Sequence, residues 1–243
     1  MLRRTYTNEI YPERRTYILK RLDFILANRG AGSRSQVRGL IRRGHVCVDG
    51  VTVKDPSAQF EPDVPVTVDG KAVSPEMTVY CVMNKPGGYV CAADTEDSVL
   101  KLIPPELYRK DLFTVGRLDK DTTGLLIITN DGDFSHCVTS PKKKTEKTYR
   151  ATLTRRVTQQ DVDRFAEGIP PFAPAKLIPG EGLTAAVTVT EGQFHEVKRL
   201  FAATGNEVTA LHRLSIGEFQ LPEDLAPGQV RALTEEEKTS ILK

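Results

Sequence analysis

One aspartate in this sequence lies where a catalytic carboxylate is expected. Asp119 falls in the run GRLDKDTTG at residues 116–124, between two apolar segments predicted to be strands, residues 112–115 and 125–129. A loop held by buried strands is a usual place for a functional side chain, and an ionised carboxylate can act as a nucleophile or stabilise developing positive charge. The residues alone support a second interpretation equally well, a structural ion pair between Asp119 and Arg117.

Other polar side chains fall on predicted elements where a structural interpretation is the commoner one. Apolar residues at helical spacing predict a helix near residues 194–203, on which His195 and Arg199 are four apart and indicate a solvated pair. Tyr149 is typical of an aromatic in a strand core. Lys142, Lys143 and Lys144 suit a solvated turn or a contact with RNA backbone equally well.

The sequence offers little for a metal site. Its four cysteines form no CxxC pair, and as free thiols they are typical of a reducing cytoplasm: Cys47, Cys81, Cys91 and Cys137. Four aspartates would suit a metal-dependent nuclease only if their carboxylates converged: Asp119, Asp121, Asp131 and Asp133. No apolar run approaches the roughly 18 residues of a membrane span. We therefore expect a cytoplasmic protein with no metal and no cofactor.

The charge is unevenly distributed along the chain. Residues 1–75 contain 13 Lys and Arg against 8 Asp and Glu, and the excess is sharpest in residues 1–45, with 11 against 3. Ten of those eleven are arginines, which match phosphate geometry better than lysine does. The pattern predicts a basic module for a polyanion, preceded by a basic arm at residues 1–16 and joined to a domain with another task.

Two short helices are predicted in this basic module. Apolar residues at 22–26 indicate the first helix, which Gly30 can end, and a capping box of Ser33 and Gln36 begins the second. Arginines recur every four residues along the exposed face of the second helix, as suits a phosphate backbone: Arg34, Arg38 and Arg42.

Asp-Gly turns at residues 49–50 and 69–70 predict two hairpins after these helices, so the module spans about residues 17–75. It resembles the small RNA-binding domain named after ribosomal protein S-four, through RLD at 21–23, RRGHV at 42–46 and VDG at 48–50. The resemblance implies that structured RNA is bound by one basic face: Arg34, Arg38, Arg42 and Arg43.

The second module, residues 76–243, carries a longer resemblance. The run GRLDKDTTGLL at 116–126 is similar to the signature of the pseudouridine synthases that modify ribosomal RNA, and EKTY at 146–149, EGQFHEVKRLFAATGN at 191–206 and LHR at 211–213 match its further elements. KPGGYVC at 85–91 brings the chain closest to the RsuA-type branch, which acts on small-subunit (16S) ribosomal RNA.

The resemblance implies a role for each matching residue. Asp119 corresponds to the catalytic aspartate, Tyr149 to a tyrosine that stacks on the target ring, and Lys198 to the cation that pairs with the aspartate. Substrate contacts are implied for a second group: Arg117, Leu118, Leu211, Arg199 and Arg213. The expected partner is 16S ribosomal RNA, in an assembly intermediate of the small subunit, bound by a monomer.

The expected fold is α+β, with the small RNA-binding domain before a larger, mixed, mainly antiparallel sheet flanked by helices. We expect strands on both sides of a turn at residues 85–88, a short helix near 134–138, and a loop at 169–182. The cleft should lie across the sheet, with Asp119 in its floor. Alternatives are a synthase acting on large-subunit RNA, a non-catalytic ribosome-assembly RNA-binding protein, and the nuclease considered above.

Overall fold

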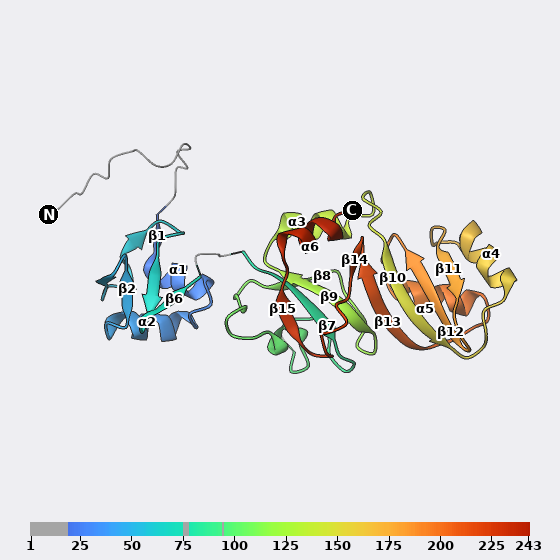
Figure 1. The fold of residues 1–243 in the computed structure, drawn as a ribbon, viewed down its shortest axis with the longest axis horizontal. Helices are drawn as coiled ribbons and strands as arrows, with labels where there is room; N and C mark the ends of the chain where they lie inside the picture. The colour runs from blue at the N-terminus through green and yellow to red at the C-terminus, as the bar shows by residue number, and fades with distance from the viewer. Residues whose placement is uncertain (1–18, 75–77, 94) are drawn as a thin grey trace. The chain divides into compact units, whose positions relative to one another are not determined.

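The chain forms two compact units that divide after Met77, and we describe each by itself (Figure 1). The structure is a computed structural model that describes residues 19–74, 78–93 and 95–243. The division falls two residues beyond the boundary predicted from the sequence, and the basic arm predicted at residues 1–16 lies outside the described residues. No helix in the described ranges is long and apolar enough to cross a membrane.

The first unit packs two helices against short antiparallel strands. Strands β1 and β4 pair with each other, and a second sheet has the order β3-β2-β5-β6. The bounds are β1 Lys20–Arg21, α1 Leu22–Asn28, α2 Arg34–Arg42, β2 Val46–Val48, β3 Val51–Thr52, β4 Gln59–Phe60, β5 Val66–Val68 and β6 Lys71–Val73.

Local sequence explains these elements. The Ser33 side chain accepts from the Gln36 amide and the Gln36 side chain accepts from the Ser33 amide, so the predicted capping box is present at the start of α2. Asp49 and Asp69 both have positive φ, 48° and 50°, as the two-residue hairpin turns at these positions require. Leu22, Leu26 and other buried aliphatic side chains of both helices and the sheet form the core of this unit.

The second unit is built on a nine-stranded sheet, whose main path runs β11-β12-β10-β13-β9-β7-β15. Strand β14 pairs with β13, and β8 pairs with β9. The bounds are β7 Tyr80–Lys85, β8 Phe113–Val115, β9 Thr123–Thr129, β10 Lys147–Leu153, β11 Lys176–Pro179, β12 Thr184–Val189, β13 Val208–Ile216, β14 Phe219–Gln220 and β15 Val230–Ala232.

Helices cover both faces of this sheet. Side chains of α4 (Gln159–Glu167) and α5 (Glu196–Ala203) belong to one core, and those of α3 (Gly132–Thr139) and α6 (Glu235–Ile241) belong to the other. Leu125 and Ile127 of β9 pack into one core while Leu126 and Ile128 pack into the other. Burial on both faces explains why β9 reads as a continuous apolar run.

One junction in the sheet breaks its antiparallel pattern. β13 pairs with β9 in parallel, with Arg213 opposite Gly124, whereas the other pairings recorded for the described strands are antiparallel. The α+β class and the mixed, mainly antiparallel sheet predicted from the sequence are therefore confirmed. The junction brings the loop before β9 beside the middle of β13, and the candidate active site lies there.

Three local predictions need correction. No strand follows the turn at residues 85–88, because Val90 makes only an isolated bridge to Ser98 while Gly88 donates to the Lys120 carbonyl. The predicted loop at residues 169–182 contains β11, which pairs only with β12 at the sheet's edge, where a proline is tolerated. The helix predicted near 194–203 begins at Glu196.

Candidate active site

A buried lysine, Lys85, holds the loop that contains Asp119. Lys85, fully buried at the end of β7, donates from Nζ to the carbonyls of Thr122 at 2.8 Å, Pro86 at 3.1 Å and Lys120 at 3.3 Å. Burial lowers the pKa of Lys85. Three acceptors satisfy the three ammonium donors, and two of them, the Lys120 and Thr122 carbonyls, bind the loop to β7 on either side of Asp121.

A glycine allows β13 to approach this loop closely. Gly124 has φ +99°, and a Cβ atom there would lie 2.3 Å from the carbonyl oxygen of Arg213. A side chain at this position would push the two strands apart, so the parallel pairing requires glycine. The close approach brings Leu211 and Arg213 of β13 to the same cavity as Asp119.

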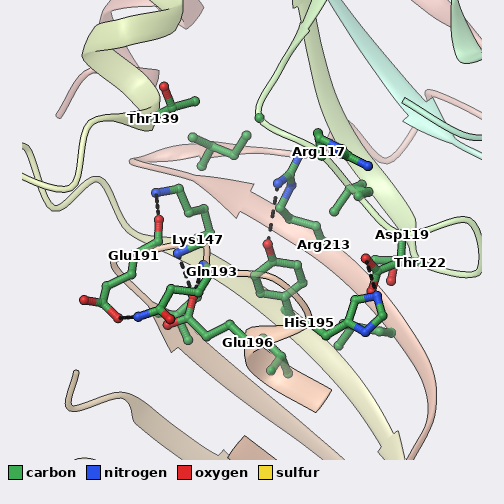
Figure 2. A pocket seen from close by; sticks show the side chains of 18 of the residues that line it. Arg117, Asp119, Thr122, Thr139, Lys147, Glu191, Gln193, His195, Glu196 and Arg213 are labelled. Carbon is green, nitrogen blue, oxygen red and sulfur yellow. Dashed lines mark hydrogen bonds and ion pairs between the residues drawn. The ribbon is translucent and has the colours of Figure 1, made fainter. Parts of the chain in front are cut away.

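Asp119 lies between the side chains of Lys198 and His195. Its Oδ2 is 3.2 Å from Nζ of Lys198 on α5, and its Oδ1 is 3.2 Å from Nε2 of His195, a contact drawn in Figure 2. Lys198 also donates to Asp121 at 2.7 Å. Burial lowers the pKa of Lys198, but hydrogen bonds to Asp121 and Asp119 outweigh it and raise that pKa overall. Lys198 therefore provides a persistent positive charge beside Asp119.

Tyr149 and Arg213 form the buried wall of the cavity. The Tyr149 side chain is on β10, and the Arg213 guanidinium lies 6.0 Å from its ring centroid. Arg213 donates from Nε to the Leu125 carbonyl at 2.7 Å, and its Nη1 is 3.5 Å from the Tyr149 hydroxyl.

Two buried polar atoms of the cavity lining lack a hydrogen-bond partner. They are Nη2 of Arg213 and Oγ1 of Thr122. Both residues are almost fully buried, with exposed fractions of 3% and 1%. Leaving a buried donor unsatisfied is costly, and neither atom has accessible surface through which a ligand in the cavity could bond to it.

Two buried charged residues hold the opposite wall, the segment at residues 190–195. Lys147 donates from Nζ to the carbonyls of Thr190 and Glu191, both at 3.4 Å. Glu196 accepts from the backbone amides of Gly192 at 2.6 Å and of residue 193 at 2.9 Å. Burial lowers the pKa of Lys147 and raises that of Glu196. Figure 2 shows Glu191 and Gln193 on the side of the cavity away from Asp119, whereas His195 lies beside Asp119.

Together these elements enclose a cavity of about 130 Å³. It brings together most of the residues implicated by the sequence: Asp119, Tyr149, Lys198, Arg117, Leu118, Leu211 and Arg213. Arg199 is not in its lining, and the Arg199 guanidinium lies 4.6 Å from the Phe172 ring centroid. Its predicted contact with substrate, like the other residue roles, stays a prediction.

Several side chains of this cavity are not among the predicted site residues, and two of them are His195, which the sequence placed in a solvated pair, and Lys147. His195 precedes α5 in a left-handed conformation, φ 52°, which turns it toward Asp119 rather than onto the helix surface beside Arg199. No local sequence signal marks that conformation. Lys147 had a usable signal, since it is two residues before Tyr149 in a strand and must share its face.

The four loop aspartates do not converge. Asp131 accepts from the amides of residues 133 and 134 and caps α3, and its other oxygen accepts from the Tyr80 hydroxyl. Across the described residues, no three His, Cys, Asp or Glu side chains are grouped so that they could hold a metal ion.

The basic face of the first unit is only partly free. Arg34, Arg38 and Arg42 are exposed on α2, as predicted. Arg38 donates from Nε to the buried carboxylate of Asp23 at 2.7 Å, so it also has a structural role. Within the described part of the chain, no hydrogen bond or ion pair is recorded for the side chains of Arg42 and Arg43, which leaves both available to phosphates.

A small basic unit followed by a sheet that holds one carboxylate beside cations suits an enzyme that acts on a polyanion. Comparison with known proteins agrees: residues 79–203 match the family model for RNA pseudouridylate synthase, and residues 20–64 match the S4 domain. The chain belongs to the RNA pseudouridine synthase family, and its first unit is an S4 domain. The family resemblance found in the sequence is thereby confirmed.

Individual relatives cover nearly the whole chain. An uncharacterized RNA pseudouridine synthase of Bacillus subtilis, YtzG, is 42% identical over 231 residues, 89% of this chain and 96% of the relative. Ribosomal small subunit pseudouridine synthase A of Escherichia coli is 40% identical, covering 91% and 100%. A crystal structure of a pseudouridylate synthase superposes with a TM-score of 0.64 at 37% identity, covering 91% and 99%.

Proposed function

We propose that this protein isomerises a specific uridine of small-subunit (16S) ribosomal RNA, with Asp119 as the catalytic carboxylate. The observation that carries the proposal is the position of Asp119 at a cavity wall, 3.2 Å from both Lys198 and His195. The choice of RNA is supported by the 40% identity to relatives named for the small ribosomal subunit.

The reaction needs the C1′–N1 glycosidic bond to break, the uracil to rotate, and a C1′–C5 bond to form, while a proton leaves C5 and N1 gains one. Atoms and electrons balance without a redox partner. Asp119 supports bond cleavage by bonding to the reacting carbon or by stabilising positive charge on the sugar. Both routes need an ionised carboxylate, whose charge the Lys198 ammonium stabilises.

The cavity is too enclosed for a base within a helix, so the uridine must leave its stack, which costs a few kcal/mol. Stacking on the Tyr149 ring, with Leu211 on the cavity wall, returns about 1–3 kcal/mol of that. Arg117, an exposed residue of the cavity lining, occupies the space that the base leaves, and Leu118 offers the substrate an apolar contact.

The S4 domain supplies sequence-independent affinity through four arginines, Arg34, Arg38, Arg42 and Arg43, which contact phosphates. Arg199 adds a phosphate contact outside the cavity. These contacts hold structured RNA so that one uridine reaches Asp119, which makes an assembly intermediate of the small subunit a suitable substrate.

The test uses unmodified small-subunit RNA, unmodified large-subunit RNA and small-subunit assembly intermediates. Pseudouridine is mapped by carbodiimide adducts that stop reverse transcription. We expect one site in small-subunit RNA and none in large-subunit RNA. The Asp119→Asn variant should lose product by on the order of 10⁴-fold or more while retaining RNA affinity.

Three outcomes would contradict this proposal. Product only in large-subunit RNA would reassign the substrate. Equal product from wild type and Asp119→Asn would remove the aspartate from its role, and no product on any of the three RNAs would favour a non-catalytic assembly protein.

A further inference from the structure

The wall segment before α5 carries an aromatic side chain that the proposed chemistry does not use. Phe194 is 74% exposed, more than any other large hydrophobic residue in the described part of the chain. Isolated exposed apolar side chains are common on protein surfaces, so exposure alone indicates nothing. The position of Phe194 does, because the residues on both sides of it, Gln193 and His195, line the cavity.

One residue, His195, lies between Phe194 and the carboxylate of Asp119. Its ring stacks on that of His195, with centroids 3.7 Å apart and planes inclined by 20°. His195 in turn lies 3.2 Å from Asp119. The left-handed backbone of His195 brings the two neighbouring rings face to face. One face of Phe194 is therefore covered by His195, and the exposed fraction leaves the other face to solvent.

The segment that presents Phe194 is firmly held. Lys147 and Glu196, both more than nine-tenths buried, bond four consecutive backbone groups of residues 190–193. Glu191 adds a side-chain bond to Gln193 at 2.8 Å and accepts from the Ala173 amide at 3.3 Å. A ring on such a support is preorganised, so little entropy is lost when a ligand stacks on it.

We propose that the free face of Phe194 is a platform for an unpaired nucleobase, the immediate neighbour of the uridine that enters the cavity. The proposal rests on the proposed function, since the cavity must first receive a flipped uridine. When that uridine leaves its stack, an adjacent base loses its stacking partner. A flat apolar ring beside the cavity replaces that partner, and any base satisfies it because every base has a π-face.

The chemistry around the ring favours nucleic acid over an apolar protein segment. The cavity lined by the two neighbours of Phe194 is also lined by Arg117 and Lys198, cations that attract a phosphodiester backbone. Apart from Gly192 and Val197, the lining residues nearest to Phe194 in the sequence are charged or polar, so no wider apolar patch is offered to a protein partner.

The test is a double-mutant cycle between the ring and the base. A short RNA fragment containing the mapped uridine is made in three forms: intact, abasic at the 5′ neighbour, and abasic at the 3′ neighbour. Phe194→Ala, Phe194→Leu and Phe194→Tyr are compared with wild type. Tyr108→Ala is the matched control, because Tyr108 is an exposed aromatic, 45%, outside the cavity lining.

On intact RNA we expect Phe194→Ala to raise KM roughly tenfold with kcat within about twofold. Phe194→Leu should behave like alanine and Phe194→Tyr like wild type, because stacking needs a ring. On one of the abasic fragments, the ratio of KM for Phe194→Ala to KM for wild type should fall to about twofold or less. The base that stacks on the ring is already absent from that fragment, so removing the ring has little further effect.

An unchanged KM for Phe194→Ala on intact RNA overturns the platform while product formation by wild type still supports the proposed function. A loss that persists on both abasic fragments also overturns it, and a loss seen only with protein-containing particles reassigns Phe194 to a protein contact. If wild type forms no product on any RNA tested, the proposed function fails and the platform fails with it.

Discussion

The ammonium group of Lys198 lies 2.7 Å and 2.9 Å from the two carboxylate oxygens of Asp121. It is thus closer to this exposed aspartate than to Asp119, at 3.2 Å. Asp121 is 74% exposed, and its hydrogen bond with Lys198 lowers its pKa. We propose that Asp121 orients Lys198 and that Asp119 is the carboxylate that the charge of Lys198 stabilises.

Removing the cation should slow the reaction more than removing its outer partner. We expect Lys198→Met to lower the single-turnover rate by about 100-fold, because one preorganised charge is lost beside Asp119. Asp121→Asn should lower it by only about three- to tenfold, since Lys198 keeps its contact with Asp119. Single-turnover kinetics on a mapped RNA fragment would decide this. Lys198→Arg serves as the charge-conserving control, and equal losses for Lys198→Met and Asp121→Asn would contradict the division of roles.

Loss of Lys85 should loosen the catalytic loop without touching substrate. Lys85→Met leaves three carbonyls without their donor in a buried place, which costs several kcal/mol of stability. We expect faster amide exchange at residues 119–123, measured by hydrogen–deuterium exchange, together with a lower kcat. Lys101→Met is a matched control, because Lys101 is exposed and donates only to the Glu96 carbonyl. Unchanged protection of the loop in Lys85→Met would show that β9 alone holds it.

The salt dependence of RNA binding should separate two kinds of arginine in the S4 domain. Arg42→Ala and Arg43→Ala should each weaken binding and reduce the slope of log K against log salt by about 1, the value for one phosphate contact. Arg38→Ala should weaken binding and also destabilise the domain, because Asp23 loses a partner. Filter binding at several salt concentrations measures the slope. An unchanged slope for Arg42→Ala and Arg43→Ala would mean that RNA contacts another face.

The stability of the S4 domain should depend on pH through the ionisation of Asp23. Hydrogen bonds from Arg21 and from Arg38 outweigh the effect of burial and lower the pKa of Asp23 to about 2. Because the folded pKa lies below the unfolded value near 3.9, this contribution is complete above about pH 4 and is lost as the pH falls toward 2. We expect Asp23→Asn to cost about 1–2 kcal/mol at pH 7 and almost nothing at pH 2.

Amide exchange of α1 and α2 across pH gives the local stability of that domain, corrected for the intrinsic exchange rate. Asp63→Asn, a substitution outside this ion-pair cluster, is the control. A difference between wild type and Asp23→Asn that is the same at pH 2 and pH 7 would show that packing, rather than charge, explains the effect.

Much of the fold could be predicted because local chemistry determines it. The capping box at Ser33, the Asp-Gly turns and the apolar run of β9 each have one favoured structure, and each is present. The same holds for the class of the sheet. The strand expected after residue 88 failed because the segment bonds to the Asp119 loop instead, a tertiary contact with no local signal.

The site was predictable only in part for the same reason. Asp119, Tyr149 and Lys198 were identified by resemblance, and the structure brings all three to one cavity. His195 was assigned to a helix surface, since nothing in the local sequence shows that a non-glycine residue adopts positive φ there. The contact of His195 with Asp119 depends on α5 packing beside a loop that lies far earlier in the sequence. Asp121 of that loop and Lys198 of α5 are 77 residues apart.

The parallel junction between β9 and β13 also sets the order in which a new chain becomes active. It joins residues about 88 positions apart, as the bond from Arg213 to Leu125 does. Contacts of such long range form late in folding, after the hairpins. A chain still emerging from the ribosome lacks β13 and therefore has no catalytic cavity, although its S4 residues are already synthesised. The catalytic cavity can therefore form only after β13 has been synthesised.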